Sequence, residues 1–330
     1  MTTDHILPAD TQAILLLCGH FDSRTDAAAK PLTLTEYNSL AAQLRRAGQR
    51  PEDLLQQAGR DQIDTLGTGS VSPERLTSLL ERGVQMSFAV EAWAREGIWV
   101  ISRGEPSYPL LLKRRLRESA PALLFGVGNR ALFDCTGLGI AGSRTANDEV
   151  LGFVRDMAMR CAAEGIVVVS GGARGVDEEA MQAALAAGGS VIGVLPEGVS
   201  RPAVAKAYRD SIQQQRLLLV SAYHPKARWT TGNAMGRNRH IYALSTWVLV
   251  ANSGTDGGTW TGAVENLKHR WTPLFVRDGG DVPPGNKKLI QSGALALADP
   301  FGPEGETLRQ RLDALAESAH AGDGAPTLFP

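Results

Sequence analysis

From residue 98 to about residue 300, short apolar runs alternate with longer stretches in which apolar residues recur at helical spacing. The short runs are rich in Val, Ile and Leu, as are strands buried on both faces. Strands that alternate with helices predict an α/β fold with a doubly wound, mostly parallel sheet. The predicted strands are Ile98–Ser102, Leu123–Val127, Leu138–Ala141, Ile166–Ser170, Val191–Leu195, Leu217–Ser221, Val248–Ala251, Leu274–Val276 and Ala294–Leu297. The predicted helices between them are Asp148–Glu164, Asp177–Ala187, Ala203–Gln214, Asn233–Ser245 and Gly262–Arg270.

The first 97 residues have helical periodicity and no strand-like alternation. Thr33 precedes one periodic apolar run, and Ser72 with Pro73 has the form of a capped helix start. After residue 300 the chain has one segment of helical pattern, Glu304–Ser318. We therefore expect three parts: a small helical domain at 1–97, an α/β domain at 98–300 and an acidic C-terminal tail at 301–330.

The composition is that of an ordinary globular protein, with 330 residues, 43% hydrophobic and 21% charged. No apolar run reaches the roughly 18 residues of a membrane span, and the N-terminus lacks the pattern of a secretory signal. The three cysteines are widely spaced, which argues against disulfides and structural zinc and fits a reducing cytoplasm. The chain has no GxSxG, HExxH or Walker A pattern. We expect a cytoplasmic protein that is not an enzyme and that uses no metal, cofactor or membrane.

The net charge of −1 conceals a basic middle between acidic flanks. Residues 1–98 carry 9 Lys or Arg and 13 Asp or Glu, residues 99–300 carry 23 and 17, and residues 301–330 carry 2 and 5. Residues 211–255 contain no acid but five lysines or arginines. This local positive charge indicates a phosphate or nucleic-acid partner, although a solvated surface with acids nearby in space would have the same sequence.

Three loops after predicted strands are rich in glycine and small polar residues: 139–145, 170–177 and 252–262. Glycine lets the backbone approach a phosphate closely, and N–H groups at the start of the following helix can bind the anion. Because parallel strands end at one edge of their sheet, we expect these loops to meet there, joined by the basic segment 237–239. The alternative is that the glycines only make tight turns. The candidate DNA- or phosphate-binding residues are Gly142, Ser143, Arg144, Ser170, Gly171, Gly172, Arg174, Gly175, Arg237, Asn238, Arg239, Gly257, Gly258 and Thr259.

Two further groups of residues near these loops have more than one interpretation. Asp148 and Asp177 open predicted helices, so we interpret them as N-caps rather than as catalytic acids. Trp229, Tyr242 and Trp260 lie in or beside the basic loops. Aromatic side chains in a basic groove can stack on single-stranded bases, but each of the three could equally fill the core.

Several short segments follow one another in a fixed order between residues 98 and 300. They are Ile101–Leu110, Ala120–Gly126, Gly142–Arg144, Ser170–Asp177, Arg237–Arg239, Gly257–Ala263, Gly285–Asn286 and Gly293–Ala294. Their order resembles that of the DprA/Smf DNA-processing proteins. The resemblance implies an extended Rossmann-like fold that binds single-stranded DNA, loads a RecA-type recombinase during natural transformation or recombination, and forms a homodimer. By the same resemblance, Ser143, Arg144, Arg174, Arg237 and Arg239 hold DNA phosphates.

The chain departs from the family pattern at several positions. Met181 stands where the family has His, and Ala222 follows Ser221 where the family usually has Glu. We also expect this protein to be a member without the C-terminal winged-helix domain of many relatives. The alternative interpretation is a nucleotide-sensing Rossmann-like protein in defence or signalling, or a LOG-type nucleotide phosphoribohydrolase. LOG enzymes have the pattern PGGxGTxxE, whereas here no Pro precedes Gly257 and Glu265 falls one position late.

Overall fold

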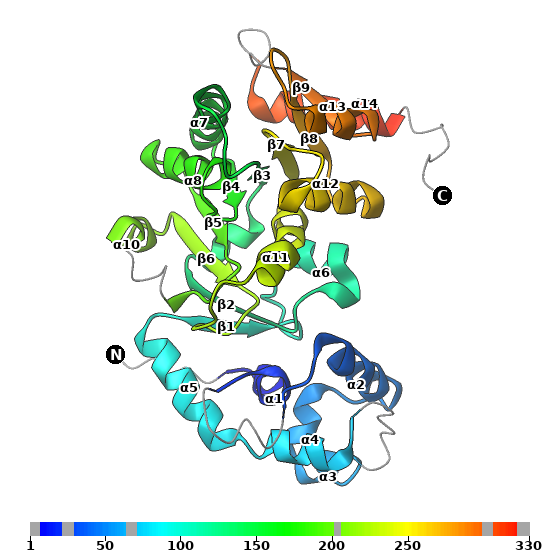
Figure 1. Cartoon of the computed structure of the whole chain (residues 1–330). Coiled ribbons are helices and arrows are strands. Elements are labelled where there is room, and N and C mark those ends of the chain that lie inside the picture. The colour runs from blue at the N-terminus through cyan, green and yellow to red at the C-terminus, as the bar shows by residue number, and fades with distance from the viewer. Residues whose placement is uncertain (1–6, 22–29, 64–70, 201–205, 299–305, 322–330) are drawn as a thin grey trace. The chain divides into compact units, whose positions relative to one another are not determined.

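The computed structural model describes residues 7–21, 30–63, 71–200, 206–298 and 306–321, and the chain forms two compact units (Figure 1). Unit 1 consists of Met1–Val127, Glu197–Ala203 and Val220–Arg228, and unit 2 of Gly128–Pro196, Val204–Leu219 and Trp229–Pro330. The sequence predicts three parts that fold independently, with boundaries at residues 97 and 300. Because the two units are defined by contacts and not by independent folding, this division stays a prediction.

Unit 1 begins with a group of helices around the buried helix α1 (Ala9–Cys18). Two predicted helix starts are confirmed: Thr33 and Glu36 form a capping box, and the Ser72 hydroxyl accepts a hydrogen bond from the Arg75 N–H. The fully buried apolar side chains of α1 are Ala13, Ile14, Leu15 and Leu17. The other helices of the group are α2 (Leu34–Arg46), the 3-10 helix η2 (Pro51–Leu55), α3 (Gln57–Arg60), α4 (Pro73–Leu80) and α5 (Gly83–Arg95).

Unit 1 also contains an antiparallel pair of strands, β1 (Trp99–Ser102) and β2 (Leu123–Gly128), whose final glycine is the first residue of unit 2. The register pairs Ser102 with Leu123. Between the strands lie the short helix α6 (Leu110–Leu116) and the 3-10 helix η3 (Arg117–Ser119). The sequence pattern did not predict α6, because seven residues are too few to show helical periodicity.

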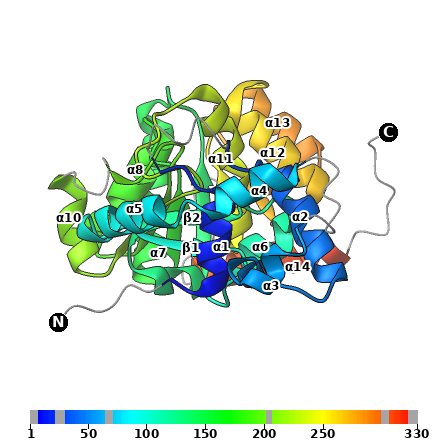
Figure 2. The same ribbon diagram turned by 90° about the horizontal axis from the view of Figure 1, so that it is seen from below.

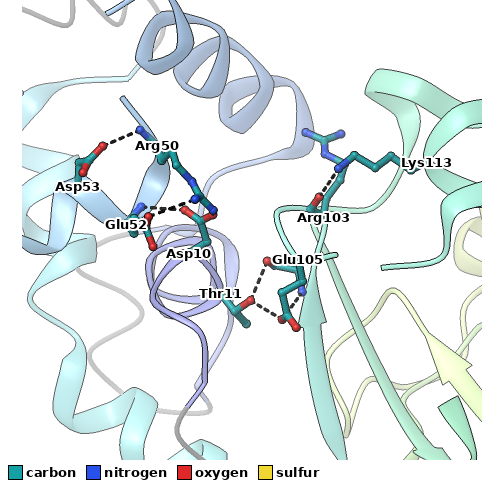
Figure 3. Close-up of polar contacts among 9 residues, drawn as sticks. Asp10, Thr11, Arg50, Glu52, Asp53, Arg103, Glu105 and Lys113 are labelled. Atoms are coloured by element: carbon teal, nitrogen blue, oxygen red, sulfur yellow. Dashed lines mark hydrogen bonds and ion pairs between the residues drawn. The ribbon is translucent and has the colours of Figure 1, made fainter. Parts of the chain in front are cut away.

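Polar contacts tie the helices of unit 1 to the segment that follows β1 (Figure 3). The hydroxyls of Thr11 and Ser102 lie 2.8 Å apart, and the Thr11 hydroxyl also donates to the carboxylate of Glu105. On α2, the side-chain oxygen of Asn38 accepts a hydrogen bond from the guanidinium of Arg103. The helices and the β1 segment therefore share hydrogen-bonded contacts within one unit.

Unit 2 is built on a sheet with the strand order β6-β5-β4-β3-β7-β8-β9. The pairs β3–β4, β3–β7, β4–β5, β7–β8 and β8–β9 are all parallel. The predicted mostly parallel α/β fold is therefore confirmed. The strands are β3 (Gly137–Ala141), β4 (Val167–Ser170), β5 (Val191–Val194), β6 (Leu217–Ser221), β7 (Trp247–Val250), β8 (Leu274–Asp278) and β9 (Leu295–Ala298).

Helices cover both faces of this sheet, as a doubly wound fold requires. Helices α7 (Asp148–Ala163) and α8 (Val176–Ala186) lie on one face, whereas α11 (Thr231–Leu244) and α12 (Gly257–His269) lie on the other (Figures 1 and 2). The remaining helices are α10 (Lys206–Gln213), α13 (Pro284–Gln291) and α14 (Leu308–Ala321). One core cluster joins α11, α12 and α13 to the sheet through Tyr242, Val248, Val250, Ala263, Leu274, Val276, Leu289 and Ala294.

Each predicted strand overlaps a strand of the structure, but two helices differ from prediction in a way that matters for the site. Helix α12 begins at Gly257 rather than Gly262, and α11 begins at Thr231 rather than Asn233. The first turns of α12 are glycine-rich, so their low helix propensity hid them in the sequence. Ala203 and Glu304, the predicted first residues of two other helices, lie outside the described residues. Within the described ranges, no helix has the length and apolar character needed to cross a membrane.

Candidate functional site

A cavity of about 570 Å³ lies within unit 2, where the chain changes direction across the sheet. Strand β3 pairs with β4 on one side and with β7 on the other, so the order of strands along the chain reverses between β3 and β7. Ligands of open α/β sheets bind at such a switch point, outside the carboxyl ends of the strands. The walls come from the loops after β3, β4 and β7, from α11 and from the start of α12.

The loop after β3 is fixed by close packing around Gly142. A Cβ at this position would lie 2.6 Å from a methyl carbon of Val176 and 2.8 Å from the side-chain oxygen of Asn252, so only glycine fits without displacing them. That Asn252 oxygen accepts a hydrogen bond of 2.9 Å from the Ser143 N–H. The loops after β3 and β7 are therefore joined directly, and Ser143 is held at the cavity wall.

Arg144 and Trp229 are two exposed side chains of the cavity wall. The guanidinium carbon of Arg144 lies 5.5 Å from the centre of the Trp229 ring, within the range of a cation–π contact. Trp229 is 47% exposed, and Met235 on α11 also leaves much of its apolar surface open at the cavity. An aromatic face with a cation beside it can receive a planar base and its phosphate.

Asp177 lies under the loops and binds their backbone. It is buried, and it accepts hydrogen bonds from the N–H groups of Gly142, Gly171 and Ala173. Burial raises the pKa of this carboxyl, against the opposing effects of Arg237 and of these hydrogen bonds. The prediction that Asp177 is an N-cap is wrong, because Gly175 stands at the N-cap of α8.

The start of α7 requires a similar correction. The prediction that Asp148 caps this helix is wrong, because Asn147 is the N-cap and its side chain accepts a hydrogen bond of 3.0 Å from the Val150 N–H. Asp148 is the first helical residue, where a carboxylate still interacts favourably with the helix dipole.

Arg237 lines the cavity from α11 but is itself buried. Its Nη1 atom donates to the Val194 carbonyl oxygen at 2.9 Å and lies 3.9 Å from Asp177 Oδ2. Nearby, burial and the guanidinium groups of Arg239 and Arg237 lower the pKa of His240 to about 3, so this histidine is neutral at physiological pH. Arg237 and Asp177 partly neutralise each other, which leaves Arg144 as the exposed cation of the wall.

The N-terminus of α12 forms another part of the wall and contacts the loop after β3. The Asn238 side chain donates to the Gly258 carbonyl oxygen at 3.0 Å, and the Thr259 hydroxyl donates to the Gly142 carbonyl oxygen at 2.9 Å. Gly257 has φ 80°, a conformation that favours glycine. The first turn of a helix has N–H groups without intrahelical acceptors, so this wall can bind an anion. Asp256 also lines the cavity, as an opposing negative charge.

The structure brings only part of the predicted set to the cavity. Ser170 is buried, and its hydroxyl donates to the Ile140 carbonyl oxygen at 2.7 Å, whereas Arg174 is exposed outside the lining. The predicted residues that line the cavity are Gly142, Ser143, Arg144, Arg237, Asn238, Gly257, Gly258 and Thr259. Those outside its lining are Ser170, Gly171, Gly172, Arg174, Gly175 and Arg239.

Sequence reasoning missed or left open several residues of this wall. Met235 carried no signal, because an exposed methionine on a helix has the same pattern as a core one. Trp229 was noted only as one of three aromatic residues. Of the other two, Tyr242 is buried at the cavity and Trp260 packs against the core cluster. Among the described residues, no group of three or more His, Cys, Asp or Glu side chains is placed to hold a metal ion.

Comparisons with known proteins give this chain a family. The sequence profile of the DNA recombination-mediator protein A family matches residues 99–301. The DNA processing protein DprA of Bacillus subtilis is 29% identical over 62% of this chain and 70% of its own length, and that of Streptococcus pneumoniae is 33% identical over 53% and 63%. The matched region therefore spans about two thirds of these relatives.

Solved structures agree with the sequence comparisons. The X-ray structure of the Streptococcus pneumoniae protein matches 80% of this chain and 90% of its own, with a TM-score of 0.62 and 25% identity. The DNA processing protein A of Helicobacter pylori, which binds single-stranded DNA, matches 67% of this chain and 96% of its own, with a TM-score of 0.53 and 24% identity. The similarity to the Helicobacter pylori protein shows a shared fold.

Proposed function

The chain belongs to the DNA recombination-mediator protein A family, the DprA/Smf proteins, and we propose that it binds single-stranded DNA at the cavity of unit 2. In this proposal the protein is not an enzyme. It holds the strand for a RecA-type recombinase during transformation or recombination, as a homodimer in the cytoplasm. Its relatives are DNA-processing proteins, and the Helicobacter pylori relative binds single-stranded DNA.

The observation that carries the proposal is the wall in which Arg144 lies against Trp229 beside the start of α12. Base stacking on an aromatic side chain is independent of sequence, and the guanidinium with the helix N–H groups supplies partners for phosphate. Arg174 and Arg239 lie outside the cavity lining and would contact phosphates of the strand beyond the bound base.

The test is the salt dependence of oligo-dT binding. For a single strand, each phosphate contact contributes about 0.7 to the slope of log affinity against log salt. Arg144→Ala and Arg174→Ala should each weaken binding and reduce the slope by roughly this amount. Trp229→Ala should lower affinity by about 1–3 kcal/mol and leave the slope unchanged, because stacking releases no counterion.

The matched control is Arg45→Ala, which removes an exposed cation from the last turn of α2. We expect it to change neither affinity nor slope. Unchanged oligo-dT affinity in both Arg144→Ala and Arg174→Ala would contradict the proposal. The dimer is tested separately, because light scattering at micromolar concentration that gives the mass of one chain would remove it.

A second candidate function is supported by the size of the cavity. A volume of about 570 Å³ lies in the range of pockets for single small ligands, so a nucleotide sensor or nucleotide hydrolase is the alternative. The two functions differ in competition. If the protein binds DNA, unlabelled oligo-dT should displace labelled oligo-dT at far lower concentration than a mononucleotide does. Competition by a mononucleotide at similar concentration would favour the alternative.

A further inference from the structure

A second positively charged surface lies on unit 1, on the short helix α6 and its end. Leu110, Lys113, Arg114 and Arg117 are spaced three, four and seven residues from the first, so they share one side of the helix. Leu110 is 54% exposed, and the three cations are exposed as well. We call these four residues the α6 face.

The α6 face is distinct in charge from its surroundings. Residues 106–127 carry four Lys or Arg and a single acid, Glu118, whereas the first 98 residues are acidic. Among the described residues, no acid forms an ion pair with Arg114 or Arg117. Exposed cations that form no ion pair within the unit are available to an anionic partner.

The helix that carries this face is held in place by hydrogen bonds. The Arg103 guanidinium donates to the carbonyl oxygens of Arg117, Glu118 and Ala120 at 3.4, 3.3 and 3.0 Å. The ammonium of Lys113 donates to the Arg103 carbonyl oxygen at 2.9 Å, as Figure 3 shows. Arg103 therefore holds the backbone of η3 directly after α6, and the exposed cations stand on a fixed backbone.

Arg117 itself adopts an unfavourable conformation. Its φ is 50°, where glycine would cost least, yet the chain has a long cationic side chain there. Arg117 is the C-cap of α6, and its backbone N–H donates to the Lys113 carbonyl oxygen, so its backbone is fixed where the helix ends.

We propose that the α6 face is a second phosphate-binding surface, which contacts the backbone of single-stranded DNA longer than the strand held in the cavity of unit 2. The inference rests on the proposed function. Charge complementarity selects the partner, because guanidinium groups match phosphate and Leu110 offers apolar surface to sugar and base. The site would enlarge the length of strand that one chain covers.

The test compares two lengths of oligo-dT on the full chain, about six and about 30 nucleotides, of which the first lies within and the second exceeds the roughly 4–16 nucleotides that one single-strand binding fold covers. The variant is Arg114→Gln with Arg117→Gln, which keeps Lys113 and its structural hydrogen bond. Loss of two phosphate contacts should reduce the salt slope for the long strand by about 1.4, which is roughly a 25-fold loss of affinity at 0.1 M salt. Binding of the short strand should not change.

The matched control is Arg45→Gln with Arg46→Gln, two exposed cations of α2 in the same unit. It should leave both lengths unaffected. Unchanged affinity for the long strand in the α6 variant, or equal losses for both lengths, would overturn the inference. If the unaltered chain binds neither length, the proposed function itself fails, and this result is distinct from the other two.

Discussion

The space beside Gly171 is occupied by the guanidinium of Arg237. A Cβ on residue 171 would lie 1.4 Å from Arg237 Nη1, the atom that donates to the Val194 carbonyl oxygen. Gly171→Ala must therefore displace a buried charge from its acceptor. We expect a loss of about 2–4 kcal/mol in the free energy of unfolding, measured by urea denaturation, together with weaker oligo-dT binding.

The control for this substitution is Gly152→Ala in α7, where an added Cβ meets no atom within 4 Å. Replacement of a helical glycine by alanine should stabilise the protein by roughly 0.5–1 kcal/mol. If Gly171→Ala has stability and affinity equal to the original chain, the position assigned to the Arg237 side chain is wrong.

Individual residues also show how far sequence predicts a site. Arg144 and Arg174 have the same sequence context, an arginine in a glycine-rich loop after a strand, but only Arg144 lines the cavity. The direction of a side chain leaving a turn depends on packing, here on the contact with Trp229. That tryptophan is 85 residues away along the chain, so no local pattern could identify the pair.

At the scale of elements, the strands were predictable and the start of α12 was not. Apolar runs such as β5 and β7 contain no polar residue, so their burial follows directly from the sequence. The start of α12 depends on tertiary hydrogen bonds, from Asn238 to Gly258 and from Thr259 to Gly142. These bonds stabilise a glycine-rich turn that propensity alone would leave as a loop.

Asn286 shows how one element positions another at the cavity. It lies on α13, fully buried, and its side-chain oxygen accepts a hydrogen bond of 2.8 Å from Ser253 in the loop after β7. Its amide donates to the carbonyl oxygens of Ala251 and Arg277. Asn286→Ala would leave three buried backbone groups without this partner. We expect a loss of about 2–4 kcal/mol in unfolding free energy and weaker oligo-dT binding, since Ser253 lines the cavity.

The comparison for Asn286→Ala is Lys287→Ala, an exposed neighbour on the same helix. It should stay within about 0.5 kcal/mol of the original stability. Measurement of urea midpoint and oligo-dT affinity on the same samples separates a local effect from a global one. An Asn286→Ala protein that keeps both values would show that α13 does not position the loop.

At the scale of the whole molecule, periodicity predicts the class of fold but not the grouping of elements into units. The change from helical to strand pattern falls near residue 97, and this is where the predicted domain boundary was placed. The contacts of Thr11 and Asn38 extend past this point to Ser102, Glu105 and Arg103. Hydrogen bonds between side chains more than 60 residues apart leave no periodic signal.

The cavity and these contacts make different predictions for a chain that lacks residues 1–95. All residues that line the cavity belong to unit 2, so the shortened chain should bind oligo-dT with the affinity of the full chain and should remain sensitive to Arg144→Ala. The same deletion removes the partners of Ser102, Glu105 and Arg103 and uncovers the face of β1 against α1. We therefore expect a lower urea midpoint with unchanged affinity. The affinity for oligo-dT and the circular dichroism spectrum should be measured on one preparation of the shortened chain. A folded fragment that does not bind would contradict a cavity confined to unit 2. An insoluble fragment would contradict a domain boundary at residue 97.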